Sequence, residues 1–220
     1  MKTILILSTC CLGFMLPACS QNSTGSSTTP GKDITVGGPC EGCEALFEFP
    51  GSLDTLGMFC WLPDWNDSGT RLAVNGTVYQ PDGSPAAGVI VYIYHTDQTG
   101  HYPTRGNEKG WDRRHGYIRG WMRTNEKGEY KFFTLRPQPY PGREDPAHIH
   151  IIIKEPGKSP YWIDEYLFED DPLLTEPRRA KLENRGGSGV LHFRDYYKGR
   201  STMKSERNIY LGRNIPGYPK

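Results

Sequence analysis

The sequence lacks the features expected of a nucleic-acid-binding or membrane-spanning protein. Lys and Arg total 26 and Asp and Glu total 25, which gives a formal net charge of +1 with no long basic run. Nucleic-acid-binding domains usually concentrate positive charge on one face, so this composition argues against such a partner. The apolar stretch Ile4–Met15 falls short of the roughly 20 residues that cross a bilayer. No internal repeat is visible.

A complete zinc-binding motif is also missing. The six cysteines include one Cys-x-x-Cys pair, Cys40 and Cys43, but neither a second such pair nor a nearby pair of histidines completes a zinc site. No βαβ pattern surrounds the pair, as a thioredoxin-like redox site would require. In an exported protein we therefore expect a structural disulfide among Cys40, Cys43 and Cys60, with the pairing left open.

The first residues indicate export. Lys2 precedes the apolar stretch, and Leu16-Pro17-Ala18-Cys19 resembles the lipobox of bacterial lipoproteins. In those proteins the leader is removed, so we expect a signal peptide over residues 1–18 and lipid on Cys19; a plain signal peptide or an uncleaved anchor is the alternative. Lipid chains alone would hold the protein on the bacterial cell envelope. Ser20 favours the outer membrane, on its periplasmic or surface face.

Composition divides the rest of the chain into four parts. Residues 19–38 are rich in Ser, Thr and Gly and predict a flexible tether, and residues 39–70 form a cysteine-containing lead-in. β-branched and aromatic runs then recur, with turns such as Pro81-Asp82-Gly83 between them. These runs predict an all-β core over 71–172, and residues 173–220 are expected to be a C-terminal extension packing on that core.

The pattern of short strands predicts a β-sandwich with short helical and loop extensions. We expect strands over 72–79, 89–94, 130–135 and 148–154, and further strands within 161–168 and 207–211. One helix is expected over 177–184, because a proline stands at its start and two glycines follow it.

Two histidines separated by a single residue carry the clearest chemical signal. Within an expected strand, His148 and His150 project to the same face, where two imidazoles can hold one metal ion. A buried, hydrogen-bonded histidine pair is the alternative. Tyr140 lies eight residues upstream of His148, and Tyr102 ends a glycine-containing loop. Phenolates are hard anionic donors, so two of them beside two imidazoles favour ferric iron over zinc.

The order of these motifs resembles that of the intradiol ring-cleavage dioxygenases, the superfamily of catechol and protocatechuate dioxygenases. The resemblance runs from about residue 71 to residue 172. Its most specific part is Pro146-Ala147-His148-Ile149-His150, which follows Pro139-Tyr140-Pro141. Gly100-His101-Tyr102 and the run from Tyr166 to Pro172 also fit the family pattern. The resemblance implies a β-sandwich of the intradiol dioxygenase type.

The resemblance further implies a cofactor and a reaction. One Fe(III) per chain would be bound by Tyr102 and His150 in equatorial positions and by Tyr140 and His148 in axial positions. A catechol would chelate the iron, displace Tyr140 and give it a proton. Dioxygen would then open the ring to a cis,cis-muconate-type diacid, with both oxygen atoms incorporated. The partners would thus be a catechol-type small molecule and O2; the sequence does not indicate the oligomeric state.

Two residues near this site depart from the family pattern. Asp145 stands where family enzymes usually place an arginine; Arg143 could substitute for it if the loop bends suitably. Glu165 stands where a glutamine is usual, and a carboxylate near a dianionic catecholate costs electrostatic energy unless it is protonated or paired. We expect Tyr140, Arg143 and Glu165 to be the side chains that act on the substrate. A non-catalytic surface β-sandwich module that binds iron or catechol-type ligands is the alternative function.

A basic stretch lies between Tyr102 and the next strand. It is either a solvated loop or a rim that attracts a carboxylated aromatic ligand. Its members are Arg105, Arg113, Arg114, His115 and Arg119.

Overall fold

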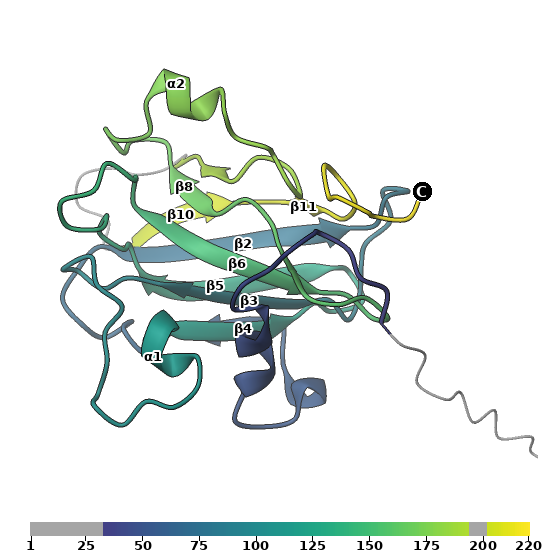
Figure 1. The fold of residues 1–220 in the computed structure, drawn as a ribbon, viewed down its shortest axis with the longest axis horizontal. Helices are drawn as coiled ribbons and strands as arrows, with labels where there is room; N and C mark the ends of the chain where they lie inside the picture. The colour runs from purple at the N-terminus through teal and green to yellow at the C-terminus, as the bar shows by residue number, and fades with distance from the viewer. Residues whose placement is uncertain (1–32, 194–201) are drawn as a thin grey trace, which may run out of the picture. The chain divides into compact units, whose positions relative to one another are not determined.

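The computed structural model describes residues 33–193 and 202–220 (Figure 1). The predicted signal peptide, the lipid attachment site Cys19 and most of the predicted tether lie outside these residues. In the described part of the chain, no helix combines the length and the apolar character that crossing a membrane requires.

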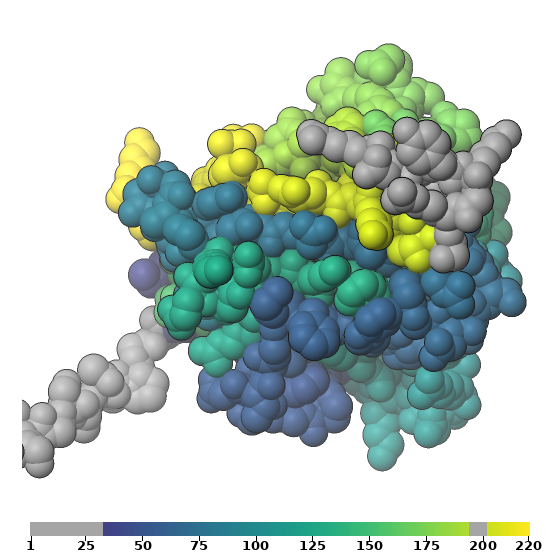
Figure 2. Space-filling model, turned by 180° about the vertical axis from the view of Figure 1, so that it is seen from behind, coloured from purple at the N-terminus to yellow at the C-terminus, as the bar shows by residue number. Residues whose placement is uncertain are grey.

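Two β-sheets pack against each other. The first sheet has the order β1 (Phe59–Trp61), β5 (Glu129–Leu135), β2 (Arg71–Tyr79) and β10 (Thr202–Glu206), and β11 (Ile209–Tyr210) also pairs with β2. Figure 2 shows its outer face, on which β10 (yellow), β2 (blue), β5 (green) and β1 (dark blue) lie side by side in this order. The second sheet has the order β4 (Arg119–Arg123), β3 (Ile90–His95), β6 (His148–Lys154), β8 (Tyr166–Phe168) and β9 (Val190–Leu191), and β7 (Tyr161–Trp162) also pairs with β6.

The main core lies between the two sheets because their strands alternate apolar and polar side chains. Val74 of β2 and Phe132 of β5 meet Ile149, Ile151 and Ile153 of β6 there, and all five side chains are buried. Burial of one such side chain contributes about 1.5–3 kcal/mol. The same alternation places His148 and His150 on the opposite, outer face of β6, as the sequence predicts.

The N-terminal lead-in covers part of that outer face with a second, smaller core. Helix η1 (Cys43–Glu48) packs Leu46 against Tyr92 of β3, and the Trp121 indole donates a hydrogen bond of 2.9 Å to the Leu46 carbonyl. The short helix η2 (Leu53–Thr55) follows. The structure forms a disulfide between Cys40 and Cys43 and leaves Cys60 as a thiol.

Two expected elements differ in the structure. The helix predicted over 177–184 is only α2 (Glu176–Arg179), because residues 181 and 182 continue with tight three-residue turns and Asn184 adopts a positive φ of 53°. The strand expected within 161–168 divides into β7 and β8. Its register on β6 shifts by one residue between the two parts, since Trp162 pairs with Ile152 but Tyr166 pairs with Ile149. This is a β-bulge, a feature that re-aims side chains.

Candidate metal centre

The metal centre forms at the end of the second sheet where β3 ends and β6 begins. These strands are antiparallel, and Tyr94 lies opposite His150. The loop that follows β3 carries Tyr102 and a single helical turn, α1 (Asp112–His115), and the loop that precedes β6 carries Tyr140. Two tyrosines from loops therefore meet two histidines from a strand, although up to 48 residues separate them in the chain.

The two loops approach each other closely at a glycine. Gly100 has a φ of 77°, and a Cβ atom there would lie 2.1 Å from the carbonyl oxygen of Pro139. Thr96 donates a hydrogen bond of 2.6 Å to the carbonyl of Gln138 at the same crossing. Only glycine fits both the backbone conformation and the space, so Gly100 allows Tyr102 to reach Tyr140.

Four donor atoms converge at this point. The Tyr102 hydroxyl lies 2.8 Å from His150 Nε2 and forms a short contact with the Tyr140 hydroxyl. The Tyr140 hydroxyl lies 3.2 Å from the Nε2 atoms of both His148 and His150, and these two nitrogens are themselves 3.2 Å apart. Separations near 3 Å are those between neighbouring ligands of one metal ion with bonds of about 2 Å.

The remaining ring nitrogens fix the tautomer of each histidine. His148 Nδ1 lies 2.7 Å from the Pro146 carbonyl oxygen, which can only accept a hydrogen bond. His150 Nδ1 lies 3.3 Å from the Glu165 carboxylate. Each ring therefore carries its proton on Nδ1 and presents an Nε2 lone pair to the other ring. A carboxylate or carbonyl behind the imidazole is the usual support of a metal-binding histidine.

A cation fits this arrangement. Two facing lone pairs repel each other, and a positive ion between them removes that repulsion. Burial, together with the Tyr140 phenol, raises the pKa of Tyr102 above its ordinary value, and burial also raises the pKa of Tyr140. Burial and the neighbouring His150 lower the pKa of His148. A bound cation favours the anionic phenols and the neutral imidazole that ligation requires.

The β-bulge determines which acidic residue lies opposite His150. The β8 register places Glu165 opposite His150, whereas continuation of the β7 register would place Asp164 there. Asp164 instead accepts the backbone N–H groups of Asn184 and Arg185. Glu165 has ligand atoms within 4.8 Å of those of His148 and His150. However, the Glu165 carboxylate contacts Nδ1 of His150, whereas the metal would bind at Nε2 on the other side of the ring. Glu165 therefore orients the ligand His150 and is not itself a ligand.

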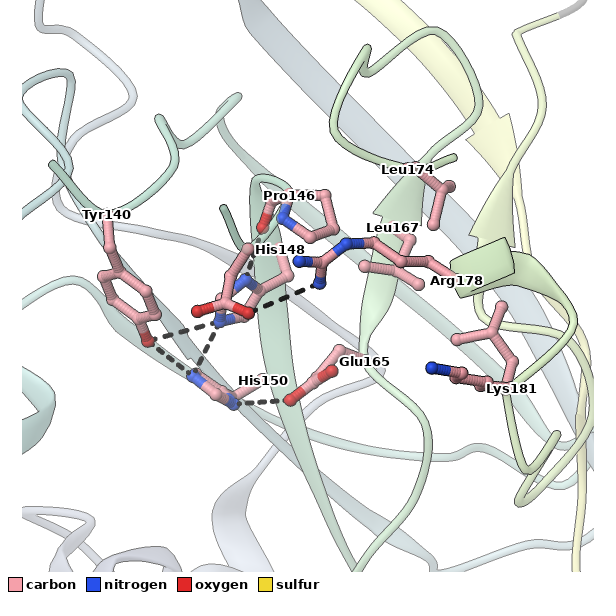
Figure 3. A pocket seen from close by; sticks show the side chains of 11 residues that line it. Tyr140, Pro146, His148, His150, Glu165, Leu167, Leu174, Arg178 and Lys181 are labelled. Atoms are coloured by element: carbon pink, nitrogen blue, oxygen red, sulfur yellow. Dashed lines mark hydrogen bonds and ion pairs between the residues drawn. The ribbon is translucent and has the colours of Figure 1, made fainter. Parts of the chain in front are cut away.

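A cavity of about 420 Å³ opens beside the centre (Figure 3). Tyr140, His148 and His150 line one end of it, and leucines from β8 and the following segment line its walls. Among the described residues, Arg143 is not part of this lining; its guanidinium lies 5.6 Å from the centre of the Tyr140 ring.

Arg178 of α2 supplies a guanidinium to the cavity instead. It lies 3.5 Å from Asp145, which stands directly before Pro146. Sequence reasoning missed Arg178 because it stands more than 30 residues beyond Asp145. The sequence shows a basic residue in an expected helix and an acidic residue in a loop. It does not show that these two residues are in contact; the structure does.

The basic stretch after Tyr102 does not line this cavity. Arg119 lies 2.9 Å from the Glu48 carboxylate of η1, and Arg114 pairs with Glu41. Arg105 lies over the ring of Tyr117. His115 stacks on Tyr94, with ring centres 3.7 Å apart. These contacts hold the loop against the lead-in.

Comparison with known proteins identifies the family. A family model described as "Dioxygenase" matches residues 59–184, more than half of the chain. Catechol 1,2-dioxygenase 1 of Acinetobacter lwoffii is 29% identical over 155 residues, which cover 58% of this chain and 48% of that protein. 6-Chlorohydroxyquinol 1,2-dioxygenase of Cupriavidus pinatubonensis is 32% identical over 105 residues, 40% of this chain and 37% of that protein.

A solved structure shares the fold. The dioxygenase domain of a dioxygenase carbohydrate-binding protein fusion from Streptomyces sp. SirexAA-E superposes with a TM-score of 0.53 at 22% identity, covering 69% of this chain and 85% of that one. The chain belongs to the intradiol ring-cleavage dioxygenase superfamily, whose members use non-haem iron. The predicted fold class is confirmed. The chain spans about half the length, or less, of the curated relatives it matches.

Proposed function

We propose that this protein cleaves a catecholic ring with dioxygen between the two hydroxyl-bearing carbons, at one ferric ion bound by Tyr102, Tyr140, His148 and His150. The observation that carries the proposal is the convergence of two phenol oxygens and two imidazole nitrogens within 3.2 Å of their nearest neighbours. Family membership supports the reaction class. Bound Fe(III) would supply a Lewis-acidic site that accepts both catechol oxygens and activates the ring toward dioxygen.

Tyr140 is the ligand best placed to exchange with a substrate. It lines the cavity, whereas Tyr102 faces a different, smaller hollow next to Tyr94 and His115. An incoming catechol therefore meets Tyr140 first. The phenol oxygen of Tyr140 can then take up a proton from a catechol hydroxyl, since its pKa without a cation is raised. Arg143, above its ring, favours the anionic form of the resting phenol.

The other cavity residues bind and orient the ring. Leu167, Leu174 and Leu182 form apolar walls that can exclude water from the aromatic face. The Glu165 carboxylate accepts a hydrogen bond from His150 Nδ1. It is therefore not the unpaired carboxylate next to the substrate that the sequence suggested. The electrostatic cost of that carboxylate is offset by this hydrogen bond.

Metal analysis, visible absorption and oxygen uptake of the purified protein test the proposal together. We expect one iron per chain, a red-brown colour from tyrosinate-bound Fe(III), and a shift of the absorption band when catechol is added. Oxygen uptake should accompany formation of a muconate-type diacid. Colourless protein with stoichiometric zinc would refute the iron site, and a shifted band without oxygen uptake would indicate a binding module.

Substitutions test the ligand assignment. Tyr140→Phe and His150→Ala should each bleach or alter the absorption band. Tyr210→Phe is a matched control, because Tyr210 stacks on Tyr79 at the pairing of β11 with β2, away from the centre. An unchanged spectrum in both ligand variants would contradict the assignment.

A further inference from the structure

The cavity beside the metal centre exceeds the size of an unsubstituted catechol. Its volume is about 420 Å³, whereas a cavity of roughly 150 Å³ suffices for benzene. The additional space extends from the ligand end toward α2 and the residues after it. Leu174 lies on this side (Figure 3), and Leu182 also lines the cavity, so a substrate that fills it has an apolar portion next to its ring.

Two cations line the cavity: Lys181 stands at the end remote from Tyr140, and the Arg178 guanidinium lies nearer the metal centre, beside Pro146 (Figure 3). Figure 3 shows Tyr140 and Lys181 on opposite sides of it, with Arg178 above Lys181. The Arg178 guanidinium is already paired, since it lies 3.5 Å from Asp145 and 3.7 Å from Glu144. Among the described residues, Lys181 forms no ion pair; the pairs of its segment use Arg178 and Arg179.

The two acidic side chains of the cavity also have partners. Asp145 faces Arg178, and Glu165 accepts the Nδ1 proton of His150. Among the described residues, Lys181 is therefore the charged side chain of the lining that has neither an ion pair nor a side-chain hydrogen bond. A ligand gains most there from a negative group that approaches Lys181 while its ring lies at the Tyr140 end.

We propose that the substrate is a catechol with an acidic arm, a carboxylate separated from the ring by at least one carbon, which pairs with Lys181. This inference rests on the proposed function, because that function places the catechol oxygens at the metal end. Lys181 is then a specificity-determining residue. It contacts the substrate far from the reacting ring carbons and selects among catechols by charge.

Binding of a matched pair of ligands tests the inference. Dissociation constants for 3-(3,4-dihydroxyphenyl)propionate and its methyl ester are measured by calorimetry on the iron-containing full chain without oxygen. The two ligands share ring and arm length and differ in one charge. We expect the acid to bind about fivefold more tightly than the ester, the upper range for an ion pair with an exposed ammonium. Catechol itself should bind more weakly than the acid.

Three variants assign the preference to Lys181. Lys181→Met should reduce the ratio of the two dissociation constants to about one, and Lys181→Arg should restore most of it. Lys127→Met, in the turn that precedes β5, is a matched control and should keep the wild-type ratio. Equal binding of acid and ester by the wild type, or an unchanged ratio in Lys181→Met, would overturn the inference.

The outcome also separates this inference from the proposed function. Equal binding of both ligands, with ring cleavage intact, refutes only the acidic arm. Absence of binding by both ligands and by catechol counts against both proposals. A preference for the acid that depends on Lys181 supports the inference even if the bound catechol is not cleaved.

Discussion

At the scale of single residues, the hydrogen bond between His150 Nδ1 and Glu165 determines what His150 can do with its other nitrogen. Burial raises the pKa of Glu165, but the hydrogen bond that its carboxylate accepts from His150 outweighs burial and holds that pKa below its ordinary value. An ionised carboxylate at Nδ1 makes Nε2 a better donor to a metal. The acidic residue that departs from the family pattern thus supports the metal centre.

Loss of that carboxylate should weaken metal binding. Glu165→Ala is expected to lower iron affinity about 10- to 100-fold, the usual effect of removing the partner of a metal-binding histidine. Glu165→Gln, whose side-chain oxygen can still accept a hydrogen bond from Nδ1, should have a smaller effect. Competition with a chelator measures the affinity. Glu169→Gln is the control, because Glu169 forms a similar pair with His192, at 2.6 Å, outside the cavity lining. Equal affinity in Glu165→Ala and Glu169→Gln would contradict the role of Glu165.

His115 should make the protein sensitive to acid. It accepts a hydrogen bond of 2.9 Å from the Tyr92 hydroxyl, and burial lowers its pKa from 6.5 to about 3. The unfolded chain therefore takes up this proton at higher pH than the folded chain does. The stability from the neutral ring is complete above pH 6.5 and is lost progressively as the pH falls toward 3.

Urea unfolding of iron-free protein between pH 4 and 7.5 measures this effect. His115→Gln should show a shallower fall in the free energy of unfolding at low pH than the wild type. His95, whose pKa is also lowered by burial, retains part of the dependence. His101→Gln, at an exposed position, is the matched control. Identical slopes in the wild type and His115→Gln would refute the prediction.

At the scale of secondary-structure elements, the metal centre depends on two local irregularities. One is the β-bulge between β7 and β8, which places Glu165 opposite His150. The other is the crossing of the loops after β3 and before β6, where Gly100 meets Pro139. Neither contributes much to the main core, yet both determine which side chains meet.

Gly100→Ala should separate the two loops. The added Cβ would meet the Pro139 carbonyl, so Tyr102 should move away from Tyr140 and iron content should fall. Gly83→Ala is a matched control, since Gly83 also has a positive φ, 86°, but a Cβ atom there would have no neighbour within 4 Å. Both variants incur about 1–2 kcal/mol from the left-handed backbone, and only Gly100→Ala should also lose iron. Metal analysis and urea unfolding compare them; full iron content in Gly100→Ala would contradict this role.

The sequence predicted long, regular strands better than short or irregular ones. β2, β3, β5 and β6 lie where runs of β-branched and aromatic residues occur, because packing between the sheets selects such residues. β1, β4, β9 and β10 were missed. β1 and β9 span only three and two residues, and β4 and β10 alternate polar or charged with apolar side chains in segments without other strand signals. The α2 helix was predicted too long because Pro177 and two glycines mark boundaries but do not determine length.

The candidate site shows a similar division. The resemblance to the intradiol dioxygenases, carried by the order of the motifs, singles out Tyr102, Tyr140, His148 and His150, and the structure brings these side chains together. The partners of these residues depend on register and loop packing. The roles of Glu165 behind His150 and of Arg178 beside Asp145 therefore follow only from three-dimensional proximity.

At the scale of the whole molecule, the residues of the metal centre are held in place by two separate regions, the main core and the N-terminal lead-in. The main core fixes β6, and the lead-in fixes the loop after β3 through Glu48, which accepts the Trp111 backbone N–H and pairs with Arg119. A bound metal would join the two loops to the sheet. Metal binding should therefore stabilise the entire fold.

Removal of iron should lower the melting temperature. A ligand present at 1,000 times its dissociation constant stabilises the folded state by about 4 kcal/mol, and each kcal/mol shifts the melting temperature of a domain of this size by roughly 2–4 °C. Scanning calorimetry before and after chelation measures the shift. His150→Ala should show little difference between the two conditions. Equal melting temperatures of iron-containing and iron-free wild type would contradict the expectation.

The ion pair between Asp33 and Lys154 places the start of the described chain at the end of β6 opposite to His148. Asp33, the first described residue, lies 3.1 Å from Lys154 at the last position of β6, while His148 begins that strand. Six strand steps of about 3.3 Å separate the two ends by roughly 20 Å. A chain tethered through the residues before Asp33 would thus be attached at the end of β6 remote from the metal centre.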